Sequence, residues 1–222
     1  MRWSHLRITA ACLSCRSDTT DMLKRFAVCC VALVAGLSGC ASQPEKGGYG
    51  DVWPTKMAAE RARALAPKKI WKLEGRLGVQ LEHDGFSAGL IWLQDHGHFD
   101  ISLFDPVGRR VARLTGNEGA VDLKTSQGQS FSGDDPEKLL QKHLGWSIPV
   151  RSLSWWVKGL PDPATVAWRQ EYDDLGRLVS LSQGGWDMHI VSYQDADRHA
   201  MPRLTRMTHD KVKLKLLIRS WE

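Results

Sequence analysis

The sequence contains no cysteine after Cys40, although the chain has 222 residues and five cysteines in all. A disulfide, a cysteine nucleophile and a cysteine-ligated zinc or iron–sulfur centre all need that side chain. Residues 41–222 therefore exclude these three kinds of site. The length and the 42% of hydrophobic residues still suit one globular domain.

An excess of positive charge is also nearly absent from that part of the chain. The formal net charge is +5, with 30 Lys and Arg against 25 Asp and Glu, but residues 1–40 hold five of the cations and two of the anions. Residues 41–222 therefore carry only 25 cations against 23 anions. A nucleic-acid-binding surface needs a concentrated basic excess, so we expect no nucleic-acid partner.

The apolar run at residues 26–37 is too short to cross a membrane, because its 12 residues fall well below the roughly 20 that a helix needs. A basic segment beginning at Met22 precedes the run, and Leu37-Ser38-Gly39-Cys40 follows it. This order of basic, apolar and small residues predicts a secretory signal peptide. Nothing in a signal peptide requires residues 1–21, which we expect to be a miscalled extension before a start at Met22.

The residues that end at Cys40 resemble a bacterial lipobox. The resemblance implies that Cys40 receives a diacylglyceryl thioether, that cleavage occurs before it, and that its new amino group is acylated. We therefore predict a signal peptide at 22–39, an acylated cysteine with a flexible tether at 40–53, and a single folded domain at 54–222. The alternative is that Cys40 only ends a hydrophobic segment.

Beyond the tether, the pattern of apolar residues changes from a helical period to a strand period. Pro54 can begin a helix over residues 54–65, and Pro67 ends it. From Trp71 onward apolar and charged residues alternate, as a half-buried strand requires, and Asp84-Gly85 is a hairpin turn signal. We predict further strands at 86–94, 99–104, 109–115, 120–125, 129–132, 166–172, 178–182, 186–193, 203–208 and 212–221.

A helical insertion interrupts these strands. Asp134 and Asp135 provide an N-cap, Pro136 fits the first helical position, and Gly145 ends a helix that carries three leucines. A second helical segment is predicted at 150–158. A long antiparallel sheet must curl, and the two predicted helical regions can cover its concave face. The pattern therefore predicts a mainly β (α+β) fold: a strongly curled antiparallel sheet of about 10–11 strands, with helices over its concave apolar face.

The motifs that resemble catalytic signatures lack the structural context that their chemistry needs. Residues 85–89 match the G-x-S-x-G nucleophile elbow around Ser87, but that elbow needs a strand followed by a helix, and here a turn is followed by a strand. His96 and His98 flank a turn glycine without a third metal ligand at a fixed spacing. No P-loop or dinucleotide-binding fingerprint is present. We therefore predict neither an enzyme nor a metal site, and no cofactor.

Tryptophan is unusually frequent in the predicted mature chain, which holds nine of the ten tryptophans and only four phenylalanines. The strand alternation and the helical insertion place many of these indoles inward: Trp71, Trp92, Trp155, Trp156, Trp168 and Trp186. An ordinary aromatic core is one interpretation. A large apolar concave face under helices instead suggests a cavity for an apolar ligand.

Several segments occur together in a fixed order along the chain. They are the lipobox, Arg-Leu-Gly-Val at 76–79, Leu-Ile-Trp-Leu-Gln at 90–94, Asp-Pro-Val-Gly at 105–108, Ser-Ile-Pro-Val-Arg-Ser-Leu at 147–153, Trp-Val-Lys-Gly-Leu-Pro at 156–161, and the basic, alternating last strand. In these segments and their order, essentially all of residues 22–222 resembles the LolB family of outer-membrane lipoprotein receptors. The resemblance implies that residues 54–222 form one lipid-binding domain, an unclosed antiparallel β-barrel with helices over a concave apolar cavity.

The resemblance also implies a function and its partners. LolB proteins accept acylated lipoproteins from the periplasmic carrier LolA and insert them into the inner leaflet of the outer membrane without a nucleotide. Ala41, in the place where Asp marks inner-membrane retention in enteric bacteria, points to a lipid anchor on the periplasmic face of the outer membrane. We expect a monomer. The alternatives are a lipid-carrying or structural outer-membrane lipoprotein of similar fold and, further away, a lipobox-anchored esterase.

Two groups of residues are candidates for that function. In the family, an exposed apolar residue between the third and fourth strands serves membrane insertion, and the matching position is Val107, between Pro106 and Gly108; many relatives have Leu there. A plain turn residue is the alternative. Strand parity predicts that the acyl-chain cavity is lined by Leu77, Val79, Leu90, Trp92, Ile101, Leu103, Trp156, Trp168, Met188, Ile190, Leu214 and Leu216.

Overall fold

The computed structural model describes residues 52–117 and 119–222. The predicted extension, signal peptide and acylated Cys40, and nearly all of the tether, lie outside the described residues. The predictions about them are therefore not addressed by the structure.

The first described element is helix α2 (Val52–Leu65), which confirms the helix predicted at 54–65. Ala58, Arg61 and Leu65 are buried, three and four residues apart, so one side of the helix faces the protein. Arg61 is almost fully buried and donates hydrogen bonds to the backbone oxygens of Lys158, Gly159, Arg198 and Ala200, at 2.7–3.1 Å. A charged side chain on α2 therefore ties the helix to two loops far away in sequence.

Eleven antiparallel strands form one sheet in the order β6-β5-β4-β3-β2-β1-β11-β10-β9-β8-β7. β6 and β7 are the two edges and do not pair with each other, so the barrel is unclosed, as predicted. The strands are β1 (Ile70–Gln80), β2 (Gly85–Asp95), β3 (His98–Phe104), β4 (Arg110–Gly116), β5 (Val121–Thr125), β6 (Ser130–Gly133), β7 (Ala167–Tyr172), β8 (Leu178–Gln183), β9 (Trp186–Tyr193), β10 (Pro202–His209) and β11 (Val212–Trp221).

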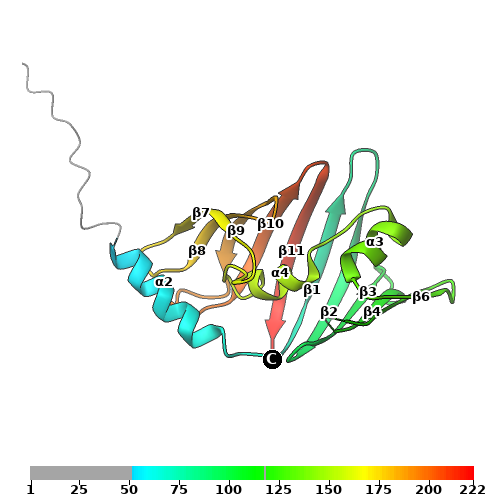
Figure 1. Cartoon of the computed structure of the whole chain (residues 1–222), viewed down its shortest axis with the longest axis horizontal. Helices are drawn as coiled ribbons and strands as arrows, with labels where there is room; N and C mark the ends of the chain where they lie inside the picture. The colour runs from blue at the N-terminus through cyan, green and yellow to red at the C-terminus, as the bar shows by residue number, and fades with distance from the viewer. Residues whose placement is uncertain (1–51, 118) are drawn as a thin grey trace, which may run out of the picture. The chain divides into compact units, whose positions relative to one another are not determined.

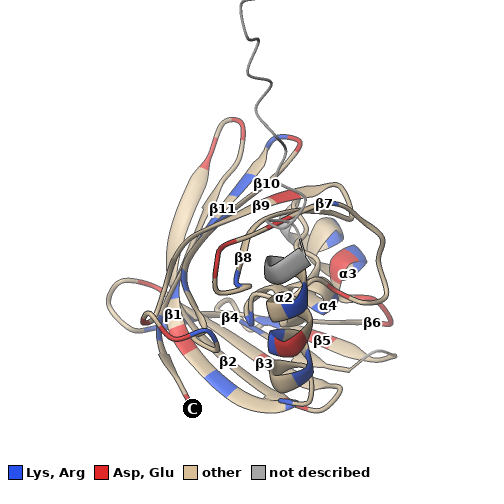
Figure 2. Cartoon of the chain, turned by 90° about the vertical axis from the view of Figure 1, so that its left-hand side faces the viewer, with Lys and Arg blue, Asp and Glu red and all other residues tan. Residues whose placement is uncertain are grey.

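Side-chain alternation separates an apolar concave face from a polar convex face. On β11, Leu214 and Leu216 are buried while Lys213 and Lys215 are exposed. The pairing of β1 with β11 joins the first half of the chain to the last, and its register shifts at Gly75, where an added Cβ would lie 2.2 Å from the Leu217 carbonyl oxygen. Only glycine permits that close approach. Figure 2 shows the sheet curving around the helices.

The helical insertion runs from one edge strand to the other, across the concave face (Figure 1). It contains α3 (Pro136–Leu144) and α4 (Val150–Trp156). The Asp135 carboxylate accepts hydrogen bonds from the backbone N–H groups of Glu137 and Lys138, and Gly145 ends α3 in the left-handed region at φ 77°. Both predicted helix signals are therefore confirmed. The leucines and tryptophans of this insertion complete the core that the sheet begins.

Candidate functional site

An apolar cavity lies between the concave face of the sheet and the helical insertion. The insertion contributes Leu140 from α3, Trp146 and Ile148 from the following link, and Leu153 from α4. The sheet contributes the rest of the lining: Leu77, Leu90, Trp92, Ile101, Leu103, Ala112, Leu114, Leu123, Met207 and Leu216. Because every one of these side chains is apolar, the cavity suits hydrocarbon and would penalise an unpaired charge.

The indole N–H of Trp92 in this lining is already bonded, since it donates to the Gln94 side-chain oxygen at 3.0 Å. The free volume is only about 40 Å³, because the side chains of α3, α4 and their link fill the concave face. Ligand pockets for molecules of drug size are roughly 300–1,000 Å³. A ligand of that size can therefore be held only if side chains or elements around the cavity move.

The two ends of the insertion are held differently. Near the C-terminal end of α4, the Trp156 indole N–H donates to the side-chain oxygen of the buried Gln183 at 2.8 Å, and the Gln183 amide group donates to the backbone oxygens of Asp162 and Thr165. At the other end, α3 rests on β5 and β6, with His143 stacked on Phe131 at 3.7 Å. The α4 end is therefore held to the sheet by buried hydrogen bonds, and the α3 end by apolar and ring contacts.

The twelve side chains that were predicted to line the cavity lie in three different kinds of place. Six line it directly: Leu77, Leu90, Trp92, Ile101, Leu103 and Leu216. Five more belong to the same buried cluster beside it: Val79, Trp156, Met188, Ile190 and Leu214. Their role in holding acyl chains stays a prediction.

The placement of Trp168 was wrong. Its side chain is 82% exposed, although strand parity predicted an inward position. β7 is an edge strand, and its register against β8 shifts between Ala167 and Arg169, so the alternation is interrupted at this residue. Conversely, sequence patterns missed Trp146 and Ile148, which lie in the irregular link between the two helices and follow no period.

The predicted insertion loop is a tight, ordered turn between β3 and β4. The Asp105 carboxylate accepts hydrogen bonds from the backbone N–H groups of Val107 and Arg109 and from Nε of Arg109, at 2.7–3.0 Å. The Arg109 backbone bond is the largest cause that lowers the pKa of Asp105, so the carboxylate is charged at neutral pH. Gly108 takes a positive φ of 86°. Val107 is thereby presented with 76% of its surface exposed.

The rejected catalytic and metal candidates have ordinary positions. Ser87 lies within β2 opposite Gly78, and in the described part of the chain no hydrogen bond joins it to a histidine or a carboxylate. His96 contacts Asp95 at 2.7 Å on the surface. No cluster of three metal-ligating side chains occurs among residues 52–117 and 119–222. Of the three helices in these ranges, none combines the length and apolar character that a membrane crossing needs.

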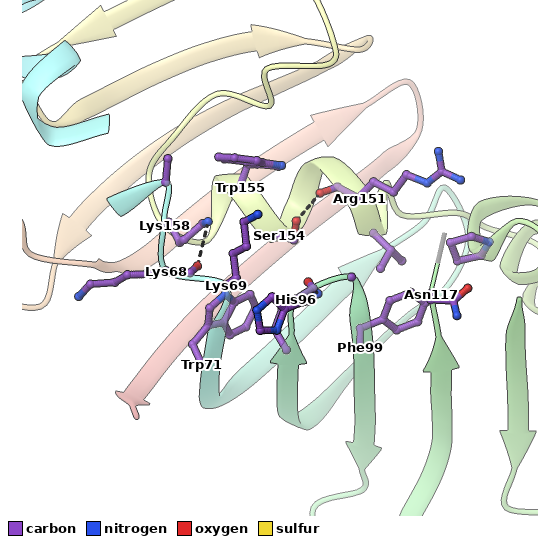
Figure 3. A pocket seen from close by; sticks show the side chains of 15 residues that line it. Lys68, Lys69, Trp71, His96, Phe99, Asn117, Arg151, Ser154, Trp155 and Lys158 are labelled. Atoms are coloured by element: carbon purple, nitrogen blue, oxygen red, sulfur yellow. Dashed lines mark hydrogen bonds between the residues drawn. The ribbon is translucent and has the colours of Figure 1, made fainter. Parts of the chain in front are cut away.

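A second, more open pocket of about 280 Å³ lies on the other side of α4, and no sequence motif had predicted it (Figure 3). Its lining includes Lys69, Lys158 and Ser154 above the rings of Trp71 and Phe99. Trp71 also packs on Trp92 of the apolar cavity, with ring centroids 5.1 Å apart. The two hollows are therefore neighbours, one apolar and one basic.

Comparisons with known proteins point to one family. The family model described as outer membrane lipoprotein LolB matches residues 69–221. Outer-membrane lipoprotein LolB of Pseudomonas paraeruginosa is 34% identical over 197 residues, which cover 89% of this chain and 94% of that protein. The protein of that name from Pseudomonas fluorescens is 34% identical over 192 residues, or 86% and 92% of the two chains. A solved LolA superfamily protein from Nitrosomonas europaea superposes with a TM-score of 0.48 and 7% identity over 76% of this chain and 92% of that chain.

Proposed function

The chain belongs to the family of the outer-membrane lipoprotein LolB, and we propose that it is a receptor that accepts acylated lipoproteins from the periplasmic carrier LolA and inserts them into the inner leaflet of the outer membrane. The observation that carries the proposal is the wholly apolar cavity beneath the helical insertion. Its chemistry matches the acyl chains of a lipoprotein and offers nothing to a polar substrate.

Energetics explain why such a cavity is needed. Each buried methylene is worth about 0.8 kcal/mol, so a chain of roughly sixteen carbons carries on the order of 13 kcal/mol, and the chains of a lipoprotein cannot cross the periplasm bare. A protein cavity replaces water around the chains. Transfer then proceeds from the weaker to the stronger apolar site, and no nucleotide has to supply energy.

In this proposal the helical insertion is a lid. The closed form keeps the apolar lining away from water in the absence of cargo, because Leu140, Trp146, Ile148 and Leu153 occupy the concave face. Acyl chains displace these side chains, which then cover the outer side of the bound chains. Packing against the cargo replaces the apolar packing between lid and sheet, so the net cost of opening is small.

Delivery to the membrane is assigned to the loop at Val107, with Pro106 and Gly108 on either side. A valine side chain that enters the interface gains about 1.5 kcal/mol, which is enough to orient a tethered protein but not to anchor it. Anchoring is assigned to acylated Cys40, followed by the tether to residue 53. The proposed mature protein is a monomer that acts from the periplasmic face of the outer membrane.

A cross-linking experiment tests the proposal. Trp146, which lines the cavity, is replaced by p-benzoylphenylalanine, and the purified protein is mixed with a LolA–lipoprotein complex whose acyl chains are radiolabelled. We expect photo-cross-linking to the labelled chains without any nucleotide. The matched control replaces Trp168, an exposed tryptophan on β7, in the same way. Equal labelling of the two positions, or none at Trp146 after cargo has left the carrier, would contradict the assignment.

A further inference from the structure

The pocket beside α4 has an unusual electrostatic composition. Lys68, Lys69, Arg151 and Lys158 are among the fifteen residues that line it, and no Asp or Glu is. Two carboxylates that adjoin lining residues along the chain have other partners, since Asp95 contacts His96 at 2.7 Å and the charge of Glu137 interacts with that of Arg151. In a protein whose cations and anions are almost balanced beyond residue 40, such a one-sided lining concentrates positive potential in a concave place.

Lys158 is the most informative of these cations. It is only 4% exposed, yet no carboxylate lies within ion-pair distance of its ammonium group in the described ranges. The ammonium lies 4.3 Å from the centre of the Trp155 ring and 3.4 Å from the Lys68 carbonyl oxygen. A buried cation without an anion is costly, and structures retain it only where something offsets the cost.

Lys69 adds a second charge at the same place. Burial, the larger cause, and the positive charge of Lys69 together lower the pKa of Lys158 to about 8. Figure 3 shows the two ammonium groups in the space between the Trp155 ring and the rings of Trp71 and His96. The Ser154 hydroxyl is also in the lining and donates to the Arg151 carbonyl oxygen at 2.6 Å. An oxyanion placed there would receive two charged donors.

We propose that this pocket is a binding site for a phosphate group, held by the ammonium groups of Lys69 and Lys158 over an aromatic floor. Two converging cations favour a phosphate over a single carboxylate, because a phosphate monoester carries more charge and offers three acceptor oxygens. The rings of Trp71, Phe99 and Trp155 suit the carbon part of an ester. The neighbouring apolar cavity makes the headgroup of an acyl lipid the favoured source, and free phosphate the other source.

Calorimetric titration of the purified protein with three probes distinguishes a lipid headgroup from free phosphate. The probes are inorganic phosphate, dihexanoyl phosphatidic acid, and dihexanoylglycerol, which has the same chains and no phosphate. The two lipid probes are kept below their micellar concentrations. We expect phosphatidic acid to bind at least about tenfold more tightly than dihexanoylglycerol. If inorganic phosphate binds as tightly as phosphatidic acid, the phosphate site stands and its source is free phosphate.

Variants of the pocket lysines test whether phosphatidic acid binds at this pocket. Lys158→Met and Lys69→Gln should each weaken binding of phosphatidic acid about tenfold or more and leave dihexanoylglycerol binding unchanged. Lys158→Met replaces a buried cation by an apolar side chain of similar length, so it should fold. The control, Lys211→Gln, removes one charge from the β10–β11 hairpin, where Lys211 pairs with Glu82. The proposal is overturned if phosphatidic acid and dihexanoylglycerol bind equally, or if the control weakens binding as much as the pocket variants.

Discussion

Val107 is an exposed residue that its own loop holds in a fixed position. The loop around it is held by Asp105, so in the proposed insertion step the valine is already ordered before it reaches the membrane. Val107→Glu places a charge there, and we expect cargo to be accepted from the carrier as before but inserted into vesicles about tenfold more slowly, since roughly 1.5 kcal/mol of apolar burial is removed.

The control for this variant is Ile70→Glu, at the first residue of β1, where the native side chain is 67% exposed. It introduces the same charge at the opposite end of the strands. Acceptance and insertion are followed separately, by release of labelled cargo from the carrier and by its appearance in vesicles. Normal insertion by Val107→Glu, or equal loss in both variants, would show that the loop has no special role.

Lys158 makes the stability of the protein depend on pH. In the unfolded chain its ammonium group keeps its proton up to about pH 10.5, whereas in the folded protein the pKa is lowered to about 8. Between these values the unfolded state binds more protons, so the free energy of unfolding contributed by this residue rises with pH. Below pH 8 both states are protonated and the full cost of burying the charge is present.

The groups around Lys158 in the pocket are cations, an imidazole and aromatic rings. Lys68 and Lys69 precede β1, and Arg151 and Trp155 come from α4. His96 faces the pocket from the β2–β3 turn, and Arg61 of α2 donates to the Lys158 carbonyl oxygen. We expect Lys158→Met to be more stable than the native chain at pH 7, by on the order of 2 kcal/mol, and this difference to shrink between pH 8 and 10. Urea unfolding at several pH values measures it; a constant difference would contradict the assignment.

Strand parity predicted correctly whether most side chains point inward or outward, because pairing on both sides forces alternation on a central strand. Leu77, for example, lies opposite Ala88 on one side and Leu216 on the other. The prediction for Trp168 failed because β7 is an edge strand, which has a partner on one side only, and its register is shifted at this residue. The pocket around Lys158 was not predictable either, since its lysines come from segments about 90 residues apart that only the fold brings together.

At the scale of elements, α2 depends on a polar anchor more than on its apolar side. The Arg61 guanidinium satisfies four carbonyl oxygens in two loops and lies over the Tyr193 ring at 5.5 Å. Burial lowers the pKa of Arg61, although the group stays charged. Arg61→Met leaves those oxygens without donors, and we expect a loss of about 3 kcal/mol in unfolding free energy.

The exposed Arg63 on the same helix provides the comparison, because Arg63→Met removes the same charge without removing these bonds. Thermal and urea unfolding should distinguish the two variants clearly. Similar stability of both would mean that the loops are held by other contacts.

The sequence predicted the elements better than it predicted the site. Turn glycines, caps and alternation are local signals, and the observed strand bounds fall within two residues of those predicted. The lining residues that the helical insertion contributes were not predictable from such local signals. Trp146 and Ile148 lie between two helices and become lining residues only because the insertion crosses the open sheet. The family resemblance includes Ile148, within residues 147–153, but it gave neither residue a place in the lining.

For the whole molecule, the topology separates the two proposed contact regions. β3 begins beside the basic pocket, at His98 and Phe99, and ends at the loop that presents Val107. Seven residues of strand span roughly 23 Å. If Val107 faces the membrane, the basic pocket lies about that far from the loop, at the other end of β3, so a lipid headgroup bound there belongs to a molecule already taken out of the bilayer. Short-chain monomers should therefore bind more readily than intact vesicles.

The closed cavity leads to the last prediction, which concerns the molecule as a whole. Because about 40 Å³ cannot hold an acyl chain, the proposed loading requires the insertion to lift from the sheet, while the pairing of β1 with β11 stays as it is. We expect amide hydrogen exchange to increase over α3 and the link to Ile148 when cargo is bound. The amides of β1 and β11 should keep their protection, as should α4 near Trp156, where Gln183 holds the insertion. Unchanged exchange of α3 in a cargo-loaded protein would place the acyl chains outside this cavity, and loss of protection along β1 and β11 would mean that the sheet, rather than the insertion, opens.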